Sequence, residues 1–182
     1  MLAKHQATLQ DLYGVVENGK AELVNGELVR MPPTGFKPGR AGGKIFASLT
    51  RHEEDHGGGY AITDNVGFIV DLPNRQSFSP DAAWYCGAEG TMKFVSGAPE
   101  FAVEVRSESD YGPAAEQAID MKISDYFAAG TLVVWDVDLL DTEVIRVYRS
   151  DSPNTPSVYA HGEIADAEPA VPGWRFPVNK LF

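Results

Sequence analysis

The segment Phe101-Ala102-Val103-Glu104-Val105-Arg106 alternates strictly, and it decides the fold that we expect for this chain. Successive side chains of a β-strand point to opposite faces. Phe101, Val103 and Val105 therefore share one apolar face, which belongs against a core. Glu104 projects from the other face, so we expect a carboxylate on a strand whose opposite side is buried.

A second acidic residue follows a proline within a β-biased segment, Phe78 to Tyr85. Proline has no N–H to give to a sheet, so Pro80 must lie at a strand start, an edge or a bulge. Irregular strand positions are where side chains are redirected into sites. We therefore expect Asp81 to point into a site.

The segment from Pro113 to Phe127 has the features of a helix. It opens with a proline, carries an early glutamate and is followed by Gly130. Lys122 lies three residues after Ile119 and four before Tyr126, which belong to the apolar face. Residues at these spacings are neighbours on a helix, so we expect Lys122 on the inward stripe or at its border.

Asp81, Glu104 and Lys122 in one pocket could hold a divalent metal ion and activate a water against a phosphodiester. The structural alternative is that the carboxylates are solvated and that the lysine lays its stem on the core with its ammonium in water. Each residue alone fits the structural alternative, but the three together favour the chemical one.

Six strings extend this pattern along the chain: AELVNGELV, SPDAAWY, GAPEFAVEVRSESD, DMKISDYFAAG, VVWDVD and VPGWRFPVNKLF. In order and spacing they resemble the Uma-type family of restriction endonucleases, within the PD-(D/E)XK nuclease superfamily. The resemblance covers nearly the whole chain. It implies that Asp81 and Glu104 are metal ligands, with the backbone carbonyl of Val105 as a third. It also implies that the catalytic lysine has moved from the strand to the following helix, as Lys122.

Arg106 stands two residues after Glu104, where the superfamily pattern has its lysine. An arginine stays protonated and cannot exchange a proton usefully at neutral pH. We therefore assign catalysis to Lys122, and to Arg106 either a phosphate-orienting role, in contact with nucleic acid, or a carboxylate-pairing one. Glu108 and Leu139 depart from the family pattern in segments that we expect to be loops.

The segment from Ala21 to Val29 predicts a β-hairpin, because Asn-Gly between apolar runs supplies the two positive φ angles of a type I′ turn. In that register Glu22 lies opposite Val29, and Glu22 and Glu27 share a face. The resemblance suggests that one of the two, Glu22 in preference, completes the acidic site. A solvated hairpin carboxylate is the alternative for either.

The remaining pattern predicts an α/β fold: a mixed twisted sheet flanked by helices, restriction-endonuclease-like, with the N-terminal hairpin. We expect a single domain over residues 1–182. A short helix to about Val16 opens the chain, and a loop over residues 31–39 precedes a helix from about Arg40 to His56. We expect strands over residues 60–70, 78–85, 131–138 and 143–149, and mainly turns with one short strand pair over 150–170.

The net charge of −11 counts against binding to nucleic acid, whose phosphates are neutralised by basic residues. Local charge differs from the total, however. Arg40, Lys44 and Arg51 recur at spacings of four and seven, so on a helix they form one basic stripe, which is our candidate for contact with a nucleic-acid backbone. A solvated helix face is the alternative.

Composition sets further bounds on the class of protein. The sequence contains no run of about 20 apolar residues, the length that spans a bilayer, and its N-terminus lacks a secretory apolar region. We therefore expect a cytoplasmic protein without membrane contact. The single cysteine, Cys86, excludes an internal disulfide.

The rival motif is His52-Glu53-Glu54-Asp55-His56, which matches the zinc-binding pattern H-E-x-x-H. The two residues after Glu53 are acidic, where a buried zinc helix would supply apolar packing. Three glycines follow His56 at once. Histidines near a helix C-terminus are favoured by the helix dipole, so the motif favours a structural role.

These observations predict a metal-dependent endonuclease that hydrolyses phosphodiester bonds in DNA. Magnesium suits the hard oxygen ligands, with manganese as a substitute. Cleavage of both strands would favour a homodimer. The competing hypothesis is a catalytically silent module on the same scaffold that binds nucleic acid or protein.

Overall fold

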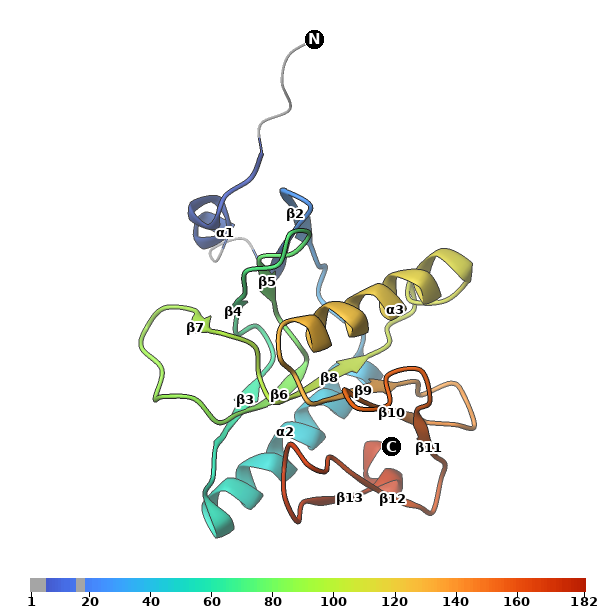
Figure 1. The fold of residues 1–182 in the computed structure, drawn as a ribbon. Coiled ribbons are helices and arrows are strands. Elements are labelled where there is room, and N and C mark those ends of the chain that lie inside the picture. The colour runs from blue at the N-terminus through green and yellow to red at the C-terminus, as the bar shows by residue number, and fades with distance from the viewer. Residues whose placement is uncertain (1–5, 16–18) are drawn as a thin grey trace.

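The centre of the protein is a six-stranded mixed sheet, seen in a computed structural model that describes residues 6–15 and 19–182 (Figure 1). The strands are β3 (Tyr60–Thr63), β6 (Ala82–Tyr85), β8 (Phe101–Val105), β9 (Val133–Val137), β10 (Ile145–Arg149) and β11 (Ser157–Tyr159). Their order is β11-β10-β9-β8-β6-β3. Only β8 and β9 are parallel within this sheet. Parallel neighbours require a crossover, and helix α3 (Pro113–Ala128) supplies it.

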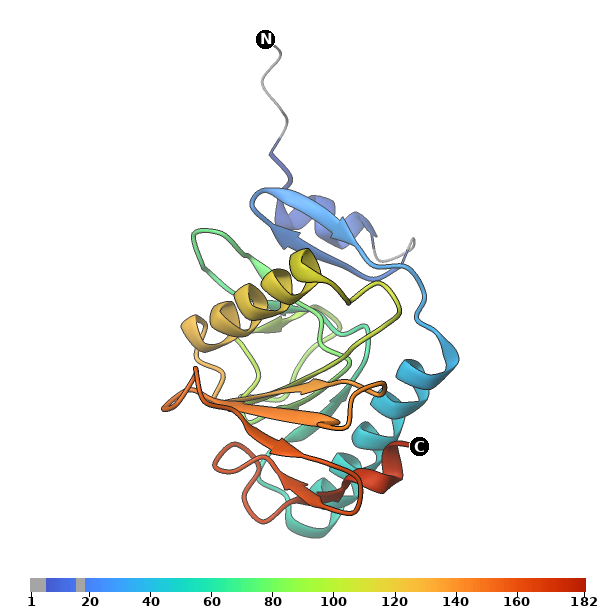
Figure 2. The ribbon, with the colours of Figure 1, turned by 90° about the vertical axis from the view of Figure 1, so that its right-hand side faces the viewer.

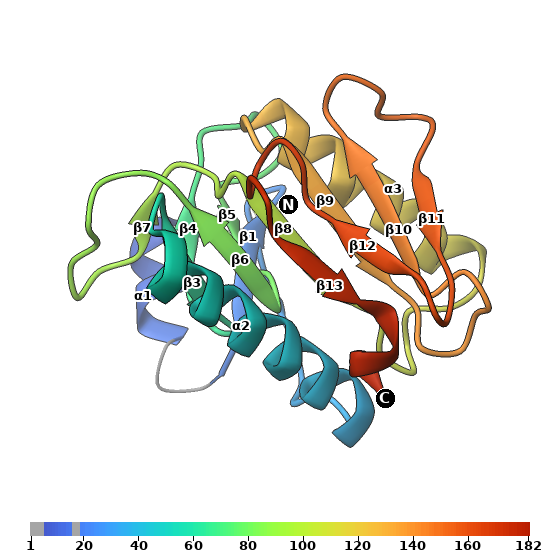
Figure 3. The same ribbon diagram turned by 90° about the horizontal axis from the view of Figure 1, so that it is seen from below.

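A long helix lies on each face of the sheet (Figures 1 and 3). The face carrying α2 (Phe36–His56) also holds the hairpin of β12 (Ile164–Asp166) and β13 (Arg175–Pro177), followed by the 3₁₀ helix η2 (Val178–Leu181). The face carrying α3 also holds a small sheet of β4 (Phe68–Ile69), β5 (Ser77–Phe78) and β7 (Val95–Ser96). This is the α/β architecture with flanking helices that the sequence predicts.

Strand β8 contributes to both cores, which confirms its predicted alternation. Phe101 and Val103 are fully buried in the core with α2, and Ala102 is fully buried in the core with α3. Glu104 follows Ala102 on the α3 side. The strand therefore aims this carboxylate at the helix that carries Lys122.

The N-terminal hairpin pairs β1 (Ala21–Val24) with β2 (Glu27–Arg30), and the short helix α1 (Leu9–Val15) packs against β1. Glu22 lies opposite Val29, as predicted. Asn25 and Gly26 have φ angles of 51° and 70°, the positive values that a type I′ turn requires. A bridge from Val24 to Arg75 ties the hairpin to the turn between β4 and β5.

Several predicted boundaries are wrong, for local reasons. The helix expected from about Arg40 begins at Phe36, because Pro38 lies in the first turn, where its missing N–H costs nothing. The strands expected over 60–70 and 78–85 are each interrupted, the second around Pro80. Strands β11 and β12 pair with β10 and β13 and not with each other. Val16, the expected end of the first helix, lies outside the described residues.

Within the part of the chain that the structure describes, no helix is both long enough and apolar enough to cross a bilayer.

The burial of α2 against the sheet predicts a large cost for Leu49→Ala. Leu49 is fully buried, and removing a buried leucine side chain costs about 2–5 kcal/mol in lost transfer energy and cavity formation. The matched control is Leu140→Ala, since Leu140 is 74% exposed. We expect urea denaturation to show a change within about 0.5 kcal/mol for the control. Equal effects of the two substitutions would contradict this packing.

Candidate active site

The structure brings Glu104 and Lys122 into direct contact. The Lys122 ammonium nitrogen lies 2.9 Å from Glu104 Oε1, and the Tyr126 hydroxyl donates to the same oxygen at 2.6 Å. Lys122 and Tyr126 are one helical turn apart, so both reach the carboxylate from one face of α3. The Glu104 and Lys122 side chains keep 22% and 18% of their surface exposed, so the pair borders solvent.

Asp81 joins this group through the backbone of β8. It follows the break around Pro80, as predicted, and its N–H donates to the carbonyl of Val103 at 2.9 Å. Its Oδ2 accepts the N–H of Val105 at 2.8 Å. The Asp81 carboxylate is therefore fixed to the residue next to Glu104, and its Oδ1 contacts the Lys20 ammonium at 2.9 Å.

Glu22 lies deeper and holds the lysine in place. Its Oε1 lies 2.9 Å from the Lys122 nitrogen and accepts the N–H of Ser79, also at 2.9 Å. Its Oε2 accepts a hydrogen bond from Arg75 at 2.6 Å. Because both oxygens are already occupied by donors, we interpret Glu22 as the residue that positions Lys122.

The charges in the site change its acid–base properties. Burial raises the pKa of Glu104, and the nearby carboxylates of Asp81 and Glu22 add to this rise against the opposing effect of Lys122. Burial alone would lower the pKa of Lys122, but Glu104 and Glu22 outweigh it and raise this pKa above its ordinary value. Lys122 therefore stays protonated at neutral pH and acts as a hydrogen-bond donor.

Sequence reasoning missed two cations of the site, Lys20 and Arg75. The Lys20 nitrogen lies 2.9 Å from Asp81 Oδ1 and 2.7 Å from Asp64 Oδ1. Arg75 bridges Glu22 and Asp125 from the turn between β4 and β5. The period-2 rule could have found Lys20, since it stands two residues before Glu22. No local pattern marks Arg75.

The donor set fits a hard divalent cation. Asp81 and Glu104 offer carboxylate oxygens. Val105 directly follows Glu104 and donates its N–H to Asp81, so its carbonyl is the third candidate ligand. With every group ionised, five carboxylates against three cationic side chains leave two negative charges. These groups are Glu22, Asp64, Asp81, Glu104 and Asp125, against Lys20, Arg75 and Lys122.

Arg106 lies outside this cluster. Its guanidinium pairs bidentately with the buried Asp136, at 2.8 and 2.7 Å, and with both oxygens of Glu116 on α3. Of the two roles that the sequence left open, this geometry supports carboxylate pairing. A contact of Arg106 with phosphate stays a prediction.

The predicted basic stripe lies on the outer side of α2. Arg40 and Arg51 are exposed, and Lys44 is half-buried and donates to the carbonyl oxygen of Phe182. The buried side of the same helix reaches the site, because Gly42 lies against the backbone of Asp81 and an added Cβ would be 3.5 Å from the Asp81 Cβ. Figure 2 shows the chain passing from the hairpin to the start of α2 along one side of the molecule.

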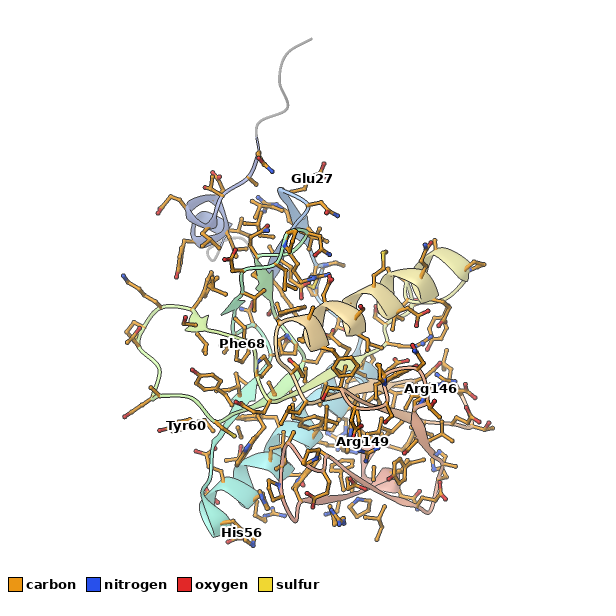
Figure 4. The ribbon with its side chains drawn as sticks, in the orientation of Figure 1. Glu27, His56, Tyr60, Phe68, Arg146 and Arg149 are labelled. Atoms are coloured by element: carbon orange, nitrogen blue, oxygen red, sulfur yellow. The ribbon has the colours of Figure 1, made fainter. Side chains whose placement is uncertain are left out.

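The residues of the H-E-x-x-H motif, His52 to His56, make contacts that do not involve a metal site. Glu53 accepts the N–H of Ala61 at 2.7 Å, and the rings of His52 and His56 stack at 4.5 Å. Figure 4 shows His56 at the end of α2 far from Glu27 on the hairpin. Among the described residues, no three or more histidine, cysteine, aspartate or glutamate side chains are grouped so that they could hold a metal ion. This applies to His52 and His56, and it also leaves Asp81 and Glu104 as a pair without a third such ligand. Among the described residues, the motif therefore does not form a zinc site.

The fold and these residues define an α/β protein of the restriction-endonuclease-like class. The family model Uma2, described as "Putative restriction endonuclease", matches residues 7–179. The chain belongs to this family.

The chain is also similar in fold to a solved structure from Anabaena variabilis ATCC 29413, described as "a putative nuclease belonging to DUF820". The TM-score is 0.72 at 16% sequence identity, and the match covers 91% of this chain and 90% of that chain. Comparison with curated proteins gives no match.

The buried position of Glu22 predicts that Glu22→Gln destabilises the protein at neutral pH. Breaking a buried ion pair by removing one partner costs about 3–5 kcal/mol, and this change leaves Arg75 and Lys122 without their anion. Burial opposes ionisation of Glu22, but Lys122 and Arg75 lower its pKa below the ordinary 4.5. Its contribution is therefore complete above pH 4.5 and is lost as pH falls through the lowered pKa.

Urea denaturation at pH 7 and at successively lower pH would measure this effect. The difference between wild type and Glu22→Gln should shrink below pH 4.5. Glu89→Gln, at an exposed position, is the control for removing one charge. A difference that stays constant as the pH falls would show that the ionised form of Glu22 is not what stabilises the fold.

Proposed function

We propose that the protein is a metal-dependent endonuclease that hydrolyses phosphodiester bonds in DNA. The observation that carries the proposal is the meeting of Asp81, Glu104 and Lys122 at the end of β8, from three segments far apart in the sequence. The family description supports DNA as the substrate. Magnesium, with manganese as a substitute, fits the oxygen ligands.

Each residue then has a defined part. Asp81, Glu104 and the Val105 carbonyl would hold the cation, with Tyr126 fixing the Glu104 carboxylate. When bound, such a cation lowers the pKa of a water and stabilises charge on a phosphate. Lys122 stays protonated and would orient an attacking water by donating a hydrogen bond, while Glu22 fixes the ammonium. Two sites on a homodimer would allow both strands of the DNA to be cut. We also propose a cytoplasmic location for the protein.

Unpaired basic residues favour contact with nucleic acid despite the net charge of −11. Seven basic residues of the described chain are held in ion pairs: Lys20, Arg75, Arg106, Lys122, Arg146, Arg149 and Arg175. Five others on β2 and α2 take part in none of these pairs: Arg30, Lys37, Arg40, Lys44 and Arg51. Because α2 also touches Asp81 through Gly42, this basic surface adjoins the site.

The enzymatic proposal predicts that Asp81→Asn and Glu104→Gln abolish nicking of a supercoiled plasmid in Mg²⁺. Lys122→Met should lower the rate by about 10²-fold or more, since positioned donors and acids contribute this much. Wild type with a chelator is the metal control, and Glu89→Gln is the substitution control. Residual activity in Asp81→Asn equal to wild type would overturn the assignment. If wild type bound DNA without cutting it, the silent binding module would be correct.

The basic surface predicts a salt-dependent effect on binding. Replacing Arg40, Lys44 and Arg51 together with glutamine should weaken binding to a DNA duplex and flatten the slope of log K against log salt by about 2–3, close to 0.9 per lost phosphate contact. Fluorescence anisotropy with Asp81→Asn as the uncleaving background would measure it. Lys93→Gln, in the exposed loop between β6 and β7, is the control. An unchanged slope in the triple variant would exclude this surface.

A further inference from the structure

Lys20 belongs to the site by contact, although the proposed reaction gives it no part. It lies just before β1, two residues from Glu22, and the side chains of both residues contact the site. Its nitrogen lies 2.9 Å from Asp81 Oδ1 and 2.7 Å from Asp64 Oδ1. Its side chain is 15% exposed. The ammonium is therefore placed between the carboxylates of Asp64 and Asp81, close to the surface.

The two oxygens of Asp81 are both engaged in this arrangement. Oδ2 accepts the N–H of Val105, which fixes the carboxylate. Oδ1 is the oxygen left for a cation, and the Lys20 ammonium already contacts it. A divalent ion and an ammonium on the same oxygen repel each other, and this repulsion grows as the distance falls. Binding of a cation to Asp81 therefore requires Lys20 to withdraw.

Asp64 offers Lys20 a place to withdraw to. It follows β3 and keeps 48% of its side-chain surface exposed, so it can pair with the ammonium on the solvent side of Asp81. Its Oδ1 also accepts the N–H of Asn65 at 2.7 Å, which fixes the carboxylate in its turn. The four-carbon stem of lysine is flexible enough to keep one partner when the other is taken.

We propose that Lys20 is a further functional residue of this site: its ammonium competes with the divalent cation for Asp81 Oδ1, and Asp64 retains it when the cation is bound. The inference rests on the proposed metal site. Lys20 is the internal counter-cation of the metal-free protein, and it sets how tightly the site takes up its ion.

Calorimetric titration with Mn²⁺ in the absence of DNA tests this competition. Lys20→Met removes the competitor and should tighten Mn²⁺ binding roughly tenfold, an effect typical of coupled sites. Lys20→Arg keeps the charge and should stay near wild type. Lys93→Met removes an exposed lysine charge from the loop between β6 and β7 and should also stay near wild type at about 0.15 M salt, because salt screens exposed charges. Asp81→Asn should bind no Mn²⁺ at this site.

Asp64→Asn provides the decisive second variant. With only Asp81 to hold it, Lys20 should block the ion more firmly, so Mn²⁺ binding should weaken several-fold, by analogy with other coupled contacts. In the Lys20→Met background the same change should have little effect. A general charge effect would instead be additive in the two backgrounds. Thermal melting without metal would confirm that each variant folds, and Lys20→Gln replaces Lys20→Met should the latter fail to fold.

Equal Mn²⁺ affinity in wild type and Lys20→Met would overturn the inference, as would an equal rise in Mn²⁺ affinity in Lys93→Met. Absence of Mn²⁺ binding in wild type, Lys20→Met and Lys20→Gln would overturn it too. Failure of the nuclease proposal is a separate result: it would show as a lack of plasmid cleavage while the Mn²⁺ affinities still follow Lys20 and Asp64.

Discussion

The buried carboxylate of Glu22 is the interaction on which the site depends. A buried charge is tolerated only when it is paired and hydrogen-bonded, and Glu22 meets this condition with partners from three other segments. Arg75 comes from the turn between β4 and β5, the N–H of Ser79 from the segment before Asp81, and Lys122 from α3. The hairpin is thereby fixed against all three, and the elements that carry the reactive groups are fixed with it.

Strand β8 organises the rest. Its alternation places Phe101 and Val103 in one core and Glu104 on the side of α3, while the N–H of Val105 holds Asp81 beside it. Arg106 then leaves the strand and joins β8, β9 and α3 through Asp136 and Glu116. The scaffold thus uses one short strand both to fill the interior and to present its acids.

Much of this could be predicted from the sequence, because it follows local periodicity. Alternation placed Glu104, helical spacing turned Lys122 inward, and the Asn-Gly turn gave the register of Glu22. The contacts of Lys20 and Arg75 could not be predicted in the same way, since their partners lie 61 and 53 residues away in the chain. The start of α2 differs from the sequence prediction because the proline-rich pattern around Pro38 predicts a loop, whereas a proline also fits the first helical turn.

The location of Lys122 on α3 has a consequence for how this protein can lose its chemistry. The acids are anchored to the central sheet, while the amine is anchored to a helix packed on its surface, and local opening occurs element by element. Loosening of α3 alone would withdraw the amine and leave the acids in place. For the proposed enzyme this gives a route to an inactive form in which Asp81 and Glu104 keep their places, reached by disturbing one helix while the sheet is unchanged.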